Sequence, residues 1–109
     1  MDIFVIKDAN GKHIRLSKER WAHITQEHQD IKGVEDIKEV LLQPTVIRPS
    51  DSDPDHVKWF YKFDKEEKLY LLVSVKYLNG EGFIITAYYT TRIKWKRKCI
   101  FTMTRKATF

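Results

Sequence analysis

The sequence predicts an α+β fold, in which a short N-terminal hairpin and two helices pack on one face of an antiparallel sheet of about four strands. Three observations predict it. Asn10-Gly11 separates two short apolar runs, helical patterns follow between residues 17 and 44, and the chain after Pro44 alternates between apolar and polar residues. With 109 residues, of which 42% are hydrophobic, the chain suits a single domain over residues 1–109.

The N-terminal elements follow from turn and capping signals. Residues 1–6 and 12–17 are predicted strands on either side of the Asn10-Gly11 turn. Ser17 is a favourable N-cap for a first helix. A second helix is predicted over residues 33–44, with acidic residues in its first turn and Pro44 at its end.

The first helix contains two of the four histidines. Its apolar face carries Trp21, Ile24 and His28, at positions i, i+3 and i+7. His23 precedes His28 by five residues, which is about 140° around a helix with 3.6 residues per turn. The two histidines are therefore predicted to point in different directions, with His28 at the end of the apolar face.

The second half of the chain reads as strands. They are predicted at residues 45–49, 57–63, 69–78 and 83–93, after the polar loop at 50–55. Two tight turns join the last three strands, which predicts an antiparallel meander.

Strand alternation sorts the residues of this meander into two faces. The predicted core face carries Val57, Trp59, Tyr61, Phe63, Leu69, Leu71, Val73, Val75, Phe83, Ile85, Ala87 and Tyr89. The predicted second face carries Lys58, Phe60, Lys62, Tyr70, Leu72, Ser74, Lys76, Ile84, Thr86, Tyr88, Thr90 and Arg92. Its cations, hydroxyls and rings suit phosphate binding and base stacking, and they equally suit an ordinary solvated sheet face.

Positive charge is concentrated at the C-terminal end. The net charge is +5, and residues 92–109 hold seven Lys or Arg and no acid, which leaves 13 basic and 15 acidic residues elsewhere. This basic tail favours an anionic partner such as nucleic acid. We expect phosphate contacts from five of its residues, namely Arg92, Lys94, Lys96, Arg97 and Lys98.

Other features narrow the functional class. The single cysteine, Cys99, excludes an internal disulfide and a CxxC metal site, and no histidine–carboxylate spacing predicts a metal or a cofactor. There is no signal-peptide pattern and no apolar run of the roughly 20 residues that span a bilayer. We therefore expect a cytoplasmic protein without a membrane partner.

Ribonuclease chemistry is compatible with these residue types. The RNA 2′-OH attacks the neighbouring phosphate when a base accepts its proton, an acid protonates the leaving 5′ oxygen, and cations or hydroxyls stabilise the charge. Histidine titrates in the required range, and Lys, Arg, Thr and Tyr supply the other groups. No metal is needed for this reaction, although the spacing of these residues alone is not specific for it.

Three segments together resemble the phage-type members of the Barnase–EndoU–colicin–RelE superfamily of small nucleases. They are IRLSKERWAHITQEH at 14–28, LLQPTVI at 41–47 and YLLVSVKYLNGEGFIITAYYT at 70–90. The resemblance covers roughly residues 12 to 94. One departure is that Gln29-Asp30 follows His28, where the family has Pro and an acid.

The resemblance implies an RNA-cleaving fold and a set of catalytic residues. It points to His23 and His28 on the helix, and to Thr86 and Tyr88 on the strand that contains the TAY motif. The predicted second face adds Lys76 and Arg92 as further candidates. The resemblance also implies tRNA or mRNA as substrate and, for a toxin of a toxin–antitoxin pair, an acidic antitoxin as partner.

Three functions remain compatible with the sequence. The first is a small metal-independent endoribonuclease. The second is a catalytically inert nucleic-acid-binding module that uses the same basic face, and the third is a protein-interaction domain whose basic tail docks an acidic partner. The first requires His28, or an equivalent base, to face the strand that carries Thr86 and Tyr88.

Overall fold

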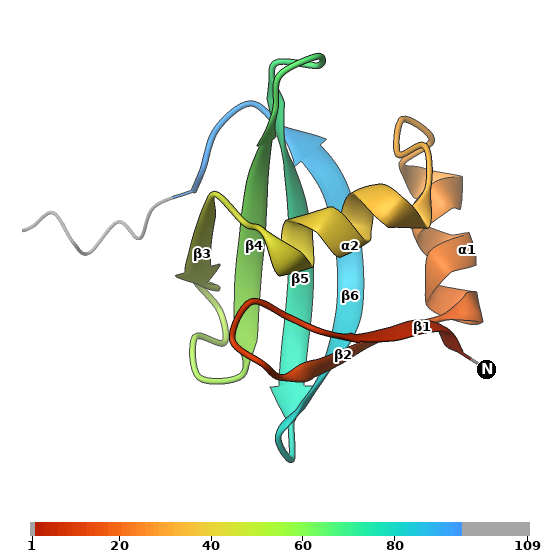
Figure 1. Cartoon of the computed structure of the whole chain (residues 1–109). Helices are drawn as coiled ribbons and strands as arrows, with labels where there is room; N and C mark the ends of the chain where they lie inside the picture. Colours follow the sequence, from red (N-terminus) through yellow and green to blue (C-terminus); the bar gives the residue numbers. More distant parts are fainter. Residues whose placement is uncertain (1, 95–109) are drawn as a thin grey trace, which may run out of the picture.

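A computed structural model describes residues 2–94 of the chain and shows an α+β fold with two helices and six strands (Figure 1). The predicted fold class is therefore confirmed. In chain order the elements are β1 (Asp2–Lys7), β2 (His13–Ser17), α1 (Lys18–Glu27), α2 (Val34–Leu42), β3 (Val46–Pro49), β4 (Val57–Asp64), β5 (Leu69–Leu78) and β6 (Glu81–Thr90). No helix among these residues is long and apolar enough to cross a membrane.

All six strands belong to one sheet, in the order β1-β2-β6-β5-β4-β3. Four of the five strand pairs are antiparallel, whereas β2 and β6 are parallel. The prediction of an antiparallel sheet of about four strands is thus wrong in detail. The N-terminal hairpin does not stand apart from the sheet, because β2 pairs with the beginning of β6.

The parallel pair is short and depends on a glycine. Ile14 lies opposite Gly82, and Arg15 lies opposite Phe83. A Cβ atom at Gly82 would collide with the side chain of Ile14 and lie 2.9 Å from the Cγ1 of Val75. Glycine therefore allows β2 to approach β6 closely.

Helix α1 begins where β2 ends. The Ser17 side chain accepts a hydrogen bond of 3.1 Å from the backbone N–H of Arg20, which is the predicted N-cap. The helix then packs against β6 beyond its short pairing with β2, and Figure 1 shows α1 beside the sheet at this edge. The sequence directly after α1 is consequently placed next to the second half of β6.

Both helices bury side chains in one hydrophobic core. Ile24 of α1 and Ile37, Val40 and Leu41 of α2 are at most 1% exposed. From the sheet, this core receives Phe4, Ile14, Leu16, Phe60, Leu71, Val73, Val75, Ile84 and Ala87. We call the side of the sheet that carries these residues the core face, and the opposite side the second face.

The register corrects the predicted faces of β4. Phe60 lies opposite Val73, which lies opposite Ala87, so all three share the core face. The prediction placed Phe60 on the second face together with Lys58 and Lys62. The structure instead gives the second face the other set of β4 residues, namely Val57, Trp59, Tyr61 and Phe63.

A bulge in β6 corrects a second group of predictions. Ser74 pairs with Thr86 but Val75 pairs with Ile84, so Ile85 is an extra residue in β6. The bulge reverses the alternation for the residues that precede it. Ile84 is therefore on the core face, and Phe83, predicted to be buried, is 38% exposed on the second face.

Candidate nucleic-acid interface

The second face presents rows of side chains that cross the sheet. One row contains Tyr61, Leu72 and Tyr88, which are direct partners on β4, β5 and β6. The next row contains Trp59, Ser74 and Thr86, and the one after it contains Val57, Lys76 and Phe83. Neighbouring rows are about 7 Å apart, because two residues of a strand separate them.

His28 lies at the β6 end of the first row. It is the C-cap of α1, and its backbone N–H donates a 2.7 Å hydrogen bond to the carbonyl oxygen of Ile24. Its half-buried ring contacts the ring of Tyr88, with 5.4 Å between the ring centroids. Because α1 runs beside β6, the end of this helix brings His28 to the second face.

His23 is not brought to the second face by any contact seen among residues 2–94. Its side chain is 52% exposed, and its Nε2 lies 3.5 Å from the carboxylate of Glu27, one helical turn later. The two histidines therefore have different surroundings in the structure. Of the two histidines, His28 is the one that contacts a residue of the TAY strand.

The other predicted catalytic residues share the second face with His28. Thr86 is opposite Ser74, Tyr88 is two residues further along β6, and Lys76 is opposite Phe83. All three side chains are partly exposed. Hydroxyl groups and an ammonium group are thus distributed over three adjacent rows.

Aromatic residues form a cluster on this face that the sequence analysis assigned largely to the core. The Tyr70 ring packs edge-on against Tyr61 and Phe63, with centroid distances of 6.3 and 5.2 Å. Phe63 is 43% exposed. The alternation does not show which residues of the aromatic run Trp59-Phe60-Tyr61 face the core, because all three are apolar enough to be buried.

The segment that follows β6 continues across the second face towards β4. The Lys94 backbone N–H donates to the Tyr61 hydroxyl at 3.2 Å, and its ammonium group lies 5.7 Å from the centre of the Trp59 ring and 3.3 Å from an Asp51 carboxylate oxygen. Burial raises the pKa of Tyr61 above its ordinary value.

The other predicted tail contacts divide into two groups. Arg92 is exposed, and its backbone carbonyl accepts a 3.3 Å hydrogen bond from the Thr90 hydroxyl. Lys96, Arg97 and Lys98 lie outside the described residues. The structure therefore describes only the beginning of the basic tail, where Lys94 contacts Tyr61 and Trp59 of β4.

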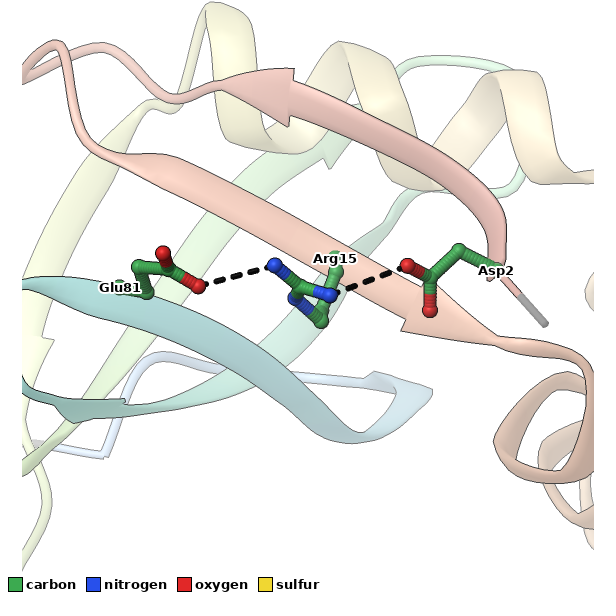
Figure 2. Close-up of polar contacts among 3 residues, drawn as sticks. All are labelled: Asp2, Arg15 and Glu81. Atoms are coloured by element: carbon green, nitrogen blue, oxygen red, sulfur yellow. Dashed lines mark hydrogen bonds and ion pairs between the residues drawn. The ribbon is translucent and has the colours of Figure 1, made fainter.

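Arg15 is a further charged residue of the second face, and it is not among the residues predicted from the sequence. Figure 2 shows its guanidinium group between two carboxylates, Asp2 at 3.2 Å and Glu81 at 2.9 Å. The same guanidinium group lies 5.7 Å from the centre of the Phe83 ring. The available signal was the alternation of Arg15 with the apolar residues Ile14 and Leu16, which turns Arg15 away from the core.

The opposite side of the sheet is less suited to nucleic acid. A cavity of about 390 Å³ there lies between α2 and the end of β4. Its lining includes four acids, Asp36, Glu39, Asp64 and Glu66, and two cations, Lys62 and Lys65. The net charge of this lining is negative and disfavours phosphate, so the second face is the better candidate.

Within residues 2–94, no group of three or more His, Cys, Asp or Glu side chains is arranged to hold a metal ion. Comparisons of the chain with protein-family models, with curated proteins and with solved structures found no match. What favours one function over another is therefore the arrangement of side chains on the second face.

Proposed function

We propose that the protein is a small metal-independent endoribonuclease whose second face binds RNA. The observation that carries this proposal is the contact between His28 and Tyr88, with 5.4 Å between ring centroids. It joins a histidine, the residue type that most often serves in general acid–base catalysis, to a face that carries hydroxyls, cations and aromatic rings. The resemblance to the phage-type nucleases, which implicates His28, Thr86 and Tyr88, also supports the proposal.

The proposed reaction uses these groups in distinct roles. The RNA 2′ oxygen forms a bond to phosphorus while the bond from phosphorus to the 5′ oxygen breaks. His28 carries out one of the two proton transfers, and Tyr88, whose ring it contacts, is the partner for the other. Thr86 and Lys76, one and two rows away, hold the phosphate oxygens. The products are a 2′,3′-cyclic phosphate and a free 5′ hydroxyl.

His23 has a smaller role in this scheme. Its side chain is exposed and lies beside Glu27, one turn further along α1. These features suit a surface residue that stabilises the helix and does not touch the substrate. A cytoplasmic location, a role as the toxin of a toxin–antitoxin pair and an acidic antitoxin partner extend the same proposal. The basic tail is the segment that such an acidic partner would contact.

A second candidate function is nucleic-acid binding without catalysis. The observation in its favour is the pair of accessible rings Phe63 and Tyr70, together with Trp59 and the Lys94 ammonium group next to it, because base stacking needs rings and cations but no proton transfer. A binding module of this kind and the nuclease share one face. They differ in whether RNA is cut.

One experiment separates these functions. Purified protein is incubated with end-labelled tRNA and mRNA in EDTA, and the product ends are mapped. The nuclease proposal predicts cleavage in EDTA with 2′,3′-cyclic phosphate ends. Binding without cleavage supports the inert module, and cleavage that EDTA abolishes contradicts the metal-independent mechanism.

A further inference from the structure

Phe83 is an exposed ring that has a cation on each of the two neighbouring strands. It lies on the second face at 38% exposure, whereas its neighbour Ile84 and Ile14 of β2 face the core and are 4% and 0% exposed. Two cations adjoin it, Arg15 on β2 and Lys76 on β5, and both are its direct partners in the sheet. A ring and two cations from three strands thus meet at one place.

The two carboxylates in Figure 2 fix the position of Arg15. Asp2 binds one terminal nitrogen of its guanidinium group at 3.2 Å, and Glu81 binds the other at 2.9 Å. The guanidinium carbon lies 5.7 Å from the centre of the Phe83 ring. Because the charge of Arg15 is matched by these acids, its contribution is a planar surface held next to the ring. Lys76 makes no ion pair within residues 2–94, and it is the cation available to a phosphate.

This group is next to the proposed reaction centre. Lys76 and Phe83 form the row adjacent to Ser74 and Thr86, about 7 Å away along the strands. One nucleotide unit spans a separation of this size. A base on the Phe83 ring and a phosphate at Thr86 therefore fit consecutive positions of one strand of RNA.

We infer that Phe83, Arg15 and Lys76 form a subsite for one nucleotide of single-stranded RNA, adjacent to the phosphate that is cleaved. The base stacks on the Phe83 ring and the neighbouring guanidinium plane, and Lys76 binds the phosphate of that nucleotide. A paired base is stacked within its own duplex and cannot use this surface. The subsite therefore selects unpaired RNA, and it rests on the proposed function of the second face.

The test measures binding without cleavage. The probe is a fluorescent single-stranded pentaribonucleotide with 2′-O-methyl riboses, which block attack by the 2′ oxygen, and its dissociation constant is measured for the full-length protein. Phe83→Ala is expected to weaken binding by roughly 5- to 150-fold, the range for loss of one stacked base. Phe83→Trp, which keeps a ring, is expected to retain the wild-type affinity.

Two matched controls accompany this comparison. Phe83→Leu keeps an apolar side chain of similar size without a ring, so it reports on stacking if the alanine variant is poorly folded. Leu42→Ala removes an exposed apolar side chain, 50%, from α2, which packs on the core face, and it is expected to change the affinity by less than about 3-fold. A series of probes with one abasic position each should contain one probe for which wild type and Phe83→Leu bind equally.

The outcomes are distinct. Loss of affinity in Phe83→Leu that disappears with one abasic probe supports the subsite. Wild-type affinity in Phe83→Leu overturns the subsite but leaves RNA binding by the second face in place. No measurable binding by the wild type overturns both, and a loss that is equal for every abasic probe shows that Phe83 supports the sheet and not a base.

Discussion

At the scale of single residues, His28 owes its position to the end of a helix. Its N–H closes the last turn of α1 on Ile24, and its ring then contacts Tyr88. His23, five residues earlier on the chain, is exposed and lies beside Glu27 instead. The proposed proton-transfer group is therefore positioned by helix termination and not by a loop.

A network of partly buried hydrogen bonds stabilises the turn of the N-terminal hairpin. The Tyr77 hydroxyl donates to Asp8 Oδ2 at 2.6 Å, while Asp8 Oδ1 accepts the backbone N–H groups of Asn10 and Lys12. Burial, followed by the bond to Asp8, raises the pKa of Tyr77 above its ordinary value of 10.0. The folded state therefore holds the Tyr77 proton more tightly than the unfolded state.

Tyr77→Phe is expected to reduce the free energy of unfolding by about 1.5–3 kcal/mol at pH 7, because a hydrogen bond to a charged group is lost. The pKa of Tyr77 is raised by folding, so its contribution is complete below pH 10 and is lost as the pH rises above 10. The difference in the free energy of unfolding between wild type and Tyr77→Phe should consequently decrease from pH 10 upwards. Urea denaturation at pH 7 and between pH 10 and 11.5 measures it, and a constant difference contradicts the assigned role.

At the scale of elements, the contact between β2 and β6 joins the hairpin to the rest of the sheet. It consists of two residue pairs, Ile14 with Gly82 and Arg15 with Phe83. Because α1 follows β2 directly, this contact places the beginning of α1 beside β6. It thereby sets the position of the other end of the helix relative to β6. The position of His28 depends on it.

Gly82→Ala is expected to destabilise the protein by about 1–3 kcal/mol, the usual cost of overpacking. Ile14 is fully buried and Val75 is β-branched, so neither side chain moves easily away from an added methyl group. Thermal unfolding measures the loss, and amide exchange in β1 and β2 should accelerate. Leu78→Ala, at a side chain 44% exposed in the same hairpin, is the control and should be nearly neutral. Equal stability of Gly82→Ala and wild type would show that this close approach is unnecessary.

The sequence predicted the elements better than their partners. Local signals, such as the Ser17 cap and the Asn10-Gly11 turn, correctly indicated where elements begin and end. The parallel pairing of β2 with β6 has no such signal, because its partners are separated by 68 residues of sequence. The hairpin therefore looked like a separate unit.

The faces of the strands show the same limit. The β4 segment Trp59-Phe60-Tyr61 is apolar in both phases, so only its register with β5 decides that Phe60 is buried in the core. In β6, the bulge at Ile85 reverses the alternation, which removed Phe83 from the predicted site. Thr86 and Tyr88 follow the bulge, and for them simple alternation gave the face that the structure has.

At the scale of the whole molecule, positive charge is concentrated at the C-terminal end of the sequence. Seven basic residues lie between residues 92 and 109, while the preceding part of the chain is nearly balanced. This basic segment starts at the second face, where Lys94 lies over Trp59. Long-range attraction of RNA should therefore depend on the tail, and recognition at short range should depend on the sheet.

Replacing Lys96, Arg97 and Lys98 with Ala should weaken RNA binding at low salt. It should also reduce the dependence of log affinity on log salt concentration by about 2 units, because each lost contact to single-stranded RNA contributes about 0.7. Titrations between 50 and roughly 300 mM salt measure this slope. A triple variant of exposed lysines in the β1–β2 and β4–β5 turns, Lys12, Lys65 and Lys68, is the control and should keep the slope. An unchanged affinity in the tail variant would show that these residues do not contact RNA.

The central claim is that His28 transfers a proton at the second face, and the most direct test compares His28→Ala with His23→Ala in RNA cleavage. Loss of a proton-transfer group lowers the rate by a factor of about 10² to 10⁴, so His28→Ala should fall by that amount while it binds RNA with wild-type affinity. His23→Ala, which removes an exposed side chain from the same helix, should lose much less activity. Cleavage at the wild-type rate by His28→Ala, or an equal loss in both variants, would contradict the claim.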